Sequence, residues 1–268
     1  MSKVITLELN NSLIFLTDAL SIAKVASKKQ NAVSLSKHTL AKSLALFSPL
    51  GQIISKTGDI STIIRSKGKI QNLVVDVNHN GIVRSYISDP NIIWDGNLNE
   101  ALSMFAFADA YLRIRILDPT FASWDSEIKM NEVTLVDDLA QFFNQSQQIA
   151  SAVFSCLKFD KDENIQEASS LIFTLLPQAN EENIKWIETF MKENSFMQLG
   201  FKKTLKLLLD QGAKIHSEKK LQWKCSCSIS KMNKALKLLS DKEIKEIKKE
   251  QGKVEIKCNF CHRSFTLE

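Results

Sequence analysis

Four of the five cysteines of this chain lie in its last fifth, in two close pairs, and their spacing constrains the fold more than any other feature. One pair, Cys225 and Cys227, forms a C-x-C motif, and the other, Cys258 and Cys261, forms a C-x-x-C motif thirty residues further on. Structural zinc takes four deprotonated ligands in a tetrahedron, and thiolates bind it at about 2.3 Å. Two close pairs separated by a foldable stretch are what one closed site requires. The spacing therefore predicts a four-cysteine site that holds one zinc ion per reduced chain.

Two other uses of the C-x-x-C motif fit the sequence less well. Cys258 to His262 spells C-x-x-C-H, a haem-attachment signature, but that chemistry needs an exported chain and leaves Cys225 and Cys227 without a role. A thioredoxin-like enzyme would place its C-x-x-C motif at the start of a helix, whereas here the motif lies between predicted strands. His262 could replace a cysteine as ligand, but with four thiols available it is predicted to be a surface residue.

The fifth cysteine, Cys156, lies outside this constellation. It shares one face of a predicted strand with Ala152 and Phe154. Free cysteine often behaves as a small buried hydrophobe, so Cys156 is predicted to be a core residue.

The cysteine-rich tail also carries the whole charge excess of the chain. Residues 221–268 hold 11 Lys plus Arg against 6 Asp plus Glu, and the full chain has a formal net charge of +5. This coincidence marks 221–268 as a separate unit.

A basic zinc module could bind nucleic acid, and this is the main alternative function. It is weakened because four thiolates on one Zn²⁺ lower the charge of the tail, and because the lysines of 242–257 alternate with glutamates, as on a solvated helix face. A purely structural zinc site on a scaffold protein is the third hypothesis.

Enzyme and membrane signatures are missing from the sequence. The eight glycines are too widely spaced for the familiar phosphate-binding or nucleophile motifs, and four scattered histidines form no evident triad. We therefore predict that the protein is not an enzyme. No apolar run approaches the ~18 residues that a membrane-spanning helix needs, and no secretory signal is evident at Met1–Phe15, so a cytoplasmic protein without membrane contacts is expected.

The first part of the chain mixes helix and strand patterns. Asp18 can cap a helix with Ile22, Val25 and Ala26 on one face, and a second helix carries Leu40, Leu44 and Phe47. Strands are predicted where apolar and polar residues alternate, at 72–77, 82–87 and 111–117, with Gly81 in the turn between the first two. A helix at 135–147 and strands at 152–159 and 165–175 follow. Residues 1–177 are therefore predicted to form an α+β core domain with a largely antiparallel sheet.

Residues 178–220 are predicted to form a helical linker docked on the core. Ile184, Ile187 and Met191 line one predicted helix, and Phe201, Leu205 and Leu208 line a second that ends near Gly212. In the tail, 221–268, a helix at 228–239, a second helix that starts with the capping box 240–243 and ends at Gly252, and strands on both sides of Cys258–Cys261 are predicted.

Taken together, these residues resemble the thirty-three-kilodalton chaperonin family of redox-regulated heat-shock holdases. The most specific match is the tail, with its C-x-C and C-x-x-C pairs at this separation. The likeness extends over nearly the full chain, and its further matching positions are Gly68, Gly81, Arg84, Tyr86, Pro90, Asp138, Leu139, Phe143, Ser146, Gln148, Leu175, Leu176, Pro177, Ala235, Leu236, Leu239 and Lys257. The chain departs from the family pattern at Ser85, at Gln147 and within 168–174, where the family has glycines or other polar residues.

The resemblance implies a mechanism. Reduced family members hold zinc through four thiolates, here Cys225, Cys227, Cys258 and Cys261, and oxidation forms disulfides between neighbours, Cys225–Cys227 and Cys258–Cys261. Zinc is then lost, the tail unfolds, and the linker 178–220 loses its support. The resemblance further implies an ATP-independent holdase that binds unfolded client proteins, is a monomer when reduced and dimerises on activation.

Overall fold

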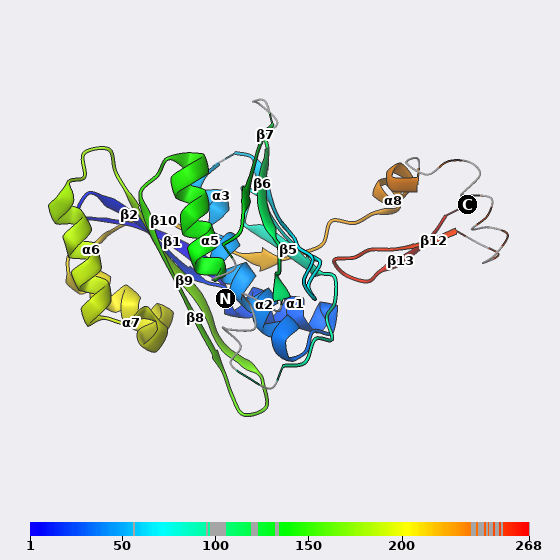
Figure 1. The fold of residues 1–268 in the computed structure, drawn as a ribbon, viewed down its shortest axis with the longest axis horizontal. Helices are drawn as coiled ribbons and strands as arrows, with labels where there is room; N and C mark the ends of the chain where they lie inside the picture. The colour runs from blue at the N-terminus through cyan, green and yellow to red at the C-terminus, as the bar shows by residue number, and fades with distance from the viewer. Residues whose placement is uncertain are drawn as a thin grey trace. The chain divides into compact units, whose positions relative to one another are not determined.

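The computed structural model describes residues 1–55, 57–94, 96, 106–118, 123–131, 134–236, 240, 244, 246, 249, 252 and 254–267. They form two compact units, unit 1 from Met1 to Trp223 and unit 2 from Lys224 to Glu268, drawn in Figure 1. The prediction of an α+β protein with a largely antiparallel sheet is confirmed. No helix among the described residues is both long and apolar enough to span a bilayer.

Unit 1 contains two sheets where the sequence predicted one. The five-stranded sheet has the order β10-β1-β2-β9-β8 and is antiparallel throughout. Its strands are β1 (Lys3–Leu9), β2 (Ser12–Asp18), β8 (Ser151–Phe159), β9 (Ile165–Leu175) and β10 (Lys214–Lys220). Strand β1 was not predicted, and the turn that joins it to β2 uses Asn10 and Asn11, both with positive φ, as a tight hairpin requires.

The six-stranded sheet has the order β11-β5-β4-β3-β6-β7. Its strands are β3 (Asp59–Arg65), β4 (Asn72–Val77), β5 (Ile82–Ile87), β6 (Tyr111–Leu117), β7 (Trp124–Lys129) and β11 (Gln222–Trp223). All pairs are antiparallel except β11 with β5. The predicted alternation of β4 is confirmed, because Leu73, Val75 and Val77 are buried while their neighbours are half-exposed. This sheet therefore has one buried face and one solvated face.

Helices α1 (Leu20–Gln30) and α2 (Ser34–Phe47) lie between the two sheets, as Figure 1 shows. The short α3 (Leu50–Ile53) follows α2, and α5 (Leu135–Phe142) continues as the π-helix η2 (Phe143–Gln147). The predicted face of the second helix is confirmed, since Leu40, Leu44 and Phe47 are buried. On α1 the prediction was wrong at Val25, which is 41% exposed, because Ala23 takes the inward position beside Ile22.

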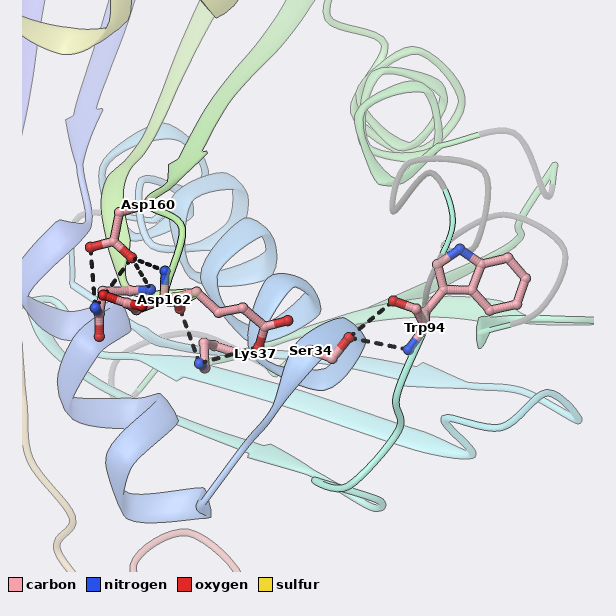
Figure 2. Close-up of polar contacts among 7 residues, drawn as sticks. Ser34, Lys37, Trp94, Asp160 and Asp162 are labelled. Atoms are coloured by element: carbon pink, nitrogen blue, oxygen red, sulfur yellow. Dashed lines mark hydrogen bonds and ion pairs between the residues drawn. The ribbon is translucent and has the colours of Figure 1, made fainter.

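A polar network joins the start of α2 to its surroundings (Figure 2). The Ser34 hydroxyl donates to the backbone carbonyl of Trp94 and accepts from its N–H, and Lys37 Nζ donates to the carbonyl of Glu163 in the β8–β9 turn. The Asp160 carboxylate accepts backbone N–H bonds from Asn164 and Asp162, and the bond from Asn164 does most to lower the pKa of this carboxyl group. These contacts fix the hairpin and the helix start against each other.

Two further helices cover the other face of the five-stranded sheet. They are α6 (Glu181–Glu193) and α7 (Phe196–Asp210), and α7 is kinked at Gly200, where φ is +67°. Their apolar residues Ile187, Phe190, Phe196, Phe201 and Leu208 form a second core cluster with sheet residues Ile5, Leu7, Ile14, Leu16, Leu171 and Phe173. This sheet is thus covered on both faces, which explains why β9 is buried almost continuously.

The expected helical character of 178–220 was wrong over its last seven residues, which form strand β10. The sequence Lys-Ile-His-Ser-Glu-Lys-Lys has no apolar alternation, and its strand conformation comes from pairing with β1. The apolar stripes of the two helices also differ in part from expectation, since Ile184 is 42% exposed and Phe190 is buried in its place.

Unit 2 is small. It contains α8 (Ile229–Leu236) and the antiparallel pair β12 (Val254–Lys257) and β13 (Ser264–Leu267). Residues 241–243 of the predicted capping box lie outside the described residues. Ile244, Glu246 and Lys249 are helical, the Ile244 N–H donates to the Ser240 carbonyl, and Gly252 has a φ of +73°, as expected at the end of a helix.

Candidate metal centre

Two local structures present the four cysteines. Cys225 and Cys227 lie in the irregular stretch that leads into α8, whose first turn is capped by the Ser228 hydroxyl accepting the Lys231 N–H. Cys258 directly follows β12, and Cys261 lies in the turn before β13. The predicted strand–knuckle–strand arrangement around the C-x-x-C motif is therefore confirmed.

Backbone hydrogen bonds close the knuckle. The Cys258 N–H donates to the Arg263 carbonyl at 2.9 Å, and the His262 N–H donates to the Cys258 carbonyl at 2.8 Å. His262 adopts a left-handed φ of +57°, which turns the chain back toward β13. These bonds fix the direction of the chain at both cysteines of the pair.

The fold brings all four cysteine sulfurs together. Their Sγ atoms lie within 4.8 Å of one another, and the closest printed approaches join the two pairs, 3.7 Å for Cys225 to Cys258 and 3.4 Å for Cys227 to Cys261. All five cysteines are free thiols. A tetrahedral ion with ligand distances of about 2.3 Å separates its sulfurs by about 3.8 Å, so the donor set and its spacing fit zinc. Four cysteines are thus positioned to hold a metal ion.

Electrostatics explain why such a cluster needs a cation. Cys227 and Cys258 are buried, at 9% and 4% exposure, while Cys225 and Cys261 are partly exposed. Burial, followed by hydrogen bonding with Cys261 and the other nearby thiols, raises the pKa of Cys227 to about 12. Burial therefore favours the protonated form of the Cys227 thiol, and a divalent cation bound by the cluster would stabilise the deprotonated form.

Two residues considered in the sequence analysis, His262 and Cys156, are not members of the cluster. His262 does not belong to the four-residue group, and burial, with a smaller contribution from Lys257, lowers its pKa. Cys156 is buried in the second core cluster, as predicted. Its Sγ donates to the Met197 carbonyl at 3.2 Å, and burial raises its pKa to about 11, so it is a structural thiol.

Sequence reasoning missed the polar contacts that hold α7 on the sheet. Besides Cys156, Lys158 Nζ donates to the Gln198 carbonyl at 2.7 Å, and Glu167 Oε1 accepts the Phe201 N–H at 2.9 Å. Glu167 thereby caps the helical turns after the kink at Gly200. The partners are more than thirty residues apart, so no local motif could have indicated them.

Comparison with known proteins gives a consistent result. A family model described as Hsp33 protein matches residues 4–268. The 33 kDa chaperonin of Clostridium perfringens (strain SM101) is 25% identical over 271 residues, covering 94% of this chain and 83% of the relative. The 33 kDa chaperonin of Prochlorococcus marinus (strain AS9601) is 30% identical over 230 residues, covering 78% and 76%.

A solved structure has the same fold. The crystal structure of a 33 kDa chaperonin, a heat shock protein 33 homolog from Thermotoga maritima, superposes with a TM-score of 0.85 at 20% identity. The match covers 100% of this chain and 94% of that one.

Proposed function

The chain belongs to the Hsp33 protein family, and from this premise we propose that it is a redox-regulated, ATP-independent holdase. In this role it binds unfolding proteins under oxidative stress in the cytoplasm, and it catalyses no reaction. The observation that carries the proposal is the convergence of four thiols, Cys225, Cys227, Cys258 and Cys261, within 4.8 Å of one another.

In the reduced protein these four residues hold one zinc ion per chain. The ion supplies the positive charge that keeps the thiolates deprotonated and the binding energy that folds unit 2. Unit 2 needs this contribution because, among its described residues, only Cys227, Val254 and Cys258 are buried. The rest of the described unit has little apolar core to stabilise it.

Oxidation removes the ligands. In each sequence pair, two thiolates give two electrons to a peroxide, one S–S bond forms, and the peroxide takes two protons and is reduced to water or alcohol. The proposed disulfides are Cys225–Cys227 and Cys258–Cys261. Cross-links between the pairs, such as Cys225 to Cys258, would instead tie the two halves of unit 2 together and restrict its unfolding. Disulfides within each pair leave the chain between them free to unfold.

Loss of unit 2 then loosens the linker 178–220. Its helices α6 and α7 cover Phe173 and neighbouring apolar residues of the five-stranded sheet. Both surfaces become available to non-native proteins when the helices lift away. The reduced protein is a monomer and the oxidised protein a homodimer in this proposal.

Aggregation of a thermally unfolded test protein measures the function directly. Light scattering should stay low only with the peroxide-treated protein, in step with the release of about one zinc per chain. Peptide mapping should find the two disulfides within the pairs. The Cys258→Ser variant should bind zinc weakly, whereas Cys156→Ser should behave as the parent.

Three results would count against the proposal. Zinc release without suppression of aggregation would mean that the site is only structural. Reduced protein free of zinc would remove the switch. Salt-sensitive binding of DNA or RNA by the zinc-loaded protein would favour the nucleic-acid alternative.

A further inference from the structure

One segment closes an edge of both sheets in unit 1. Residues 214–223, here called the edge segment, form β10 beside β1 and then β11 beside β5. Six pairs of Cα partners join β10 to β1, from Lys3 with Lys220 to Glu8 with Lys214. Between the two strands, the Leu221 N–H donates to the Ser2 carbonyl and the Gln222 N–H donates to the Gly81 carbonyl, both at 2.9 Å.

The edge segment fits closely at one point. A Cβ atom on Gly81 would meet the Lys220 carbonyl oxygen at 2.1 Å, and Gly81 has a φ of +79°. Both the conformation and the close approach require glycine there. Leu221 is the one residue of 214–223 with a buried side chain, at 4% exposure.

Most of β10 is held by its backbone alone. All its residues are exposed except the half-buried Lys219, and even Ile215 is 53% exposed. Its side-chain contacts with β1 are the exposed ion pair of Lys3 with Glu218 at 3.0 Å and the contact of His216 with Glu8 at 2.6 Å. Such surface pairs contribute little stability. The register also shifts between Thr6 and Leu7, which interrupts the pairing.

Strand β1, the partner of β10, differs from it because its apolar side chains are buried. Val4, Ile5 and Leu7 of β1 are at most 1% exposed, because helices cover both faces of this sheet. Without β10, β1 would present a row of unpaired N–H and C=O groups at the edge of an apolar sheet. Open edges of this kind accept another extended chain by strand addition.

We propose that the edge of β1 is a client-docking site, closed in the reduced protein by β10 and occupied after activation by an extended segment of a non-native protein. Recognition through main-chain hydrogen bonds suits partners that share no sequence, while apolar neighbours favour apolar client segments. The inference rests on the proposed holdase function and names the binding mode that this function uses.

The sequence couples this edge to the metal centre. Trp223, the last residue of the edge segment, precedes Cys225 by two positions. The chain that leaves β11 therefore enters the ligand set almost at once. We expect the unfolding of unit 2 to free the chain directly after Trp223, so that the edge segment can open from this end and β10 can peel from β1, starting at Lys220.

A covalent staple tests the proposal in the full-length protein. Lys3 of β1 and Lys220 of β10, which are Cα partners, are both replaced by cysteine (Lys3→Cys and Lys220→Cys). The disulfide between them is formed while zinc is bound, and mass spectrometry verifies it. The control staple, Tyr111→Cys with Lys129→Cys, joins Cα partners of β6 and β7 far from the edge segment in the strand order. After peroxide treatment both proteins should release zinc, but only the control should suppress aggregation. Equal suppression by both would overturn the proposal.

A second variant opens the edge without any oxidant. N–H groups alternate in direction along a strand, so Ser217→Pro with Glu218→Pro must remove at least one donor that faces β1. This variant should keep its zinc and yet suppress aggregation in the reduced state. Its β1 amides should exchange faster than those of the parent and become protected again when an unfolded client is added.

Failure of the proposed holdase function and failure of the edge proposal give different results. If the control staple releases zinc but binds no client, the redox-switched holdase fails, and the proline variant still tests the edge. If the proline variant exposes the β1 amides and a bound client does not protect them, clients dock elsewhere and the edge proposal is wrong.

Discussion

Units 1 and 2 of this protein are stabilised by different means. Unit 1 buries two apolar clusters, one between the sheets around α1 and α2 and one beneath α6 and α7. Unit 2 buries two cysteines and Val254 among its described residues, and its four thiols converge on one point. Hydrophobic burial is insensitive to oxidants, whereas a metal–thiolate site is not. With the proposed zinc ion held by its four thiols, unit 2 would be open to attack by an oxidant that leaves unit 1 folded.

Removal of the metal should have the largest effect. Chelation of zinc from the reduced protein should unfold unit 2, because a structural zinc site contributes roughly 10–16 kcal/mol of binding free energy at neutral pH. Hydrogen exchange should show lost amide protection in 254–267 and retained protection in β2, β4 and β9. Added zinc should restore the pattern. Amide protection in 254–267 that survives chelation would contradict this difference between the two units, because unit 2 would then fold without its ion.

Truncation of Phe173 should have a large effect confined to unit 1. Its buried ring makes edge-on contacts with Phe154, Trp186 and Phe190, with centroids 6.2–6.4 Å apart. Phe173→Ala should cost about 3–5 kcal/mol of unfolding free energy, and Phe173→Leu clearly less. Urea unfolding followed by tryptophan fluorescence reports on unit 1, which contains all four tryptophans. A zinc competition assay should give the parent affinity, and a weakened site would contradict the independence of the units.

Acid should weaken unit 1 through His38. Burial, and secondarily the charge of Lys42, lowers the pKa of this histidine from 6.5 to about 4. As the pH falls from 6.5 toward 4, the unfolded chain takes up a proton that the folded chain does not, so stability is lost with falling pH. At 1.36 kcal/mol per unit of pKa, the loss approaches about 3 kcal/mol near pH 4.

The His38→Leu variant isolates this contribution. Its stability between pH 6.5 and 4 should fall less steeply than that of the parent, because leucine takes up no proton in either the folded or the unfolded chain. Parallel profiles for parent and His38→Leu would show that another group is responsible.

The smallest effect is expected at the contact that holds α7. Glu167 Oε1 accepts both the Phe201 N–H and the Ser169 hydroxyl, so Glu167→Gln should cost about 1 kcal/mol. The loss should appear as faster amide exchange at the start of the second part of α7, with zinc affinity unchanged. Glu182→Gln, at an exposed position on α6, serves as the control. Unchanged exchange at Phe201 would show that apolar packing alone fixes this helix.

The elements that the sequence predicted well carry their signal within a few residues. Strands β4 and β6 alternate because one face of their sheet is buried, and α2 has an apolar face around Leu44. Strand β1 was missed because its sheet is covered on both faces, so that buried and more exposed positions do not alternate along it. The inward position on α1 went to Ala23 and not Val25 because neighbouring elements decide which side of a helix is buried.

The sequence by itself predicted the four-cysteine cluster, because the spacing within each cysteine pair is short and chelation is local. The tertiary structure confirmed that the two pairs meet, with Cys227 and Cys261 3.4 Å apart, and that Cys156 lies in the core. Only the tertiary structure decided the conformation of residues 214–220. A charged segment with no strand pattern of its own becomes β10 because β1 offers it a row of backbone hydrogen bonds, and such bonds are independent of side chains.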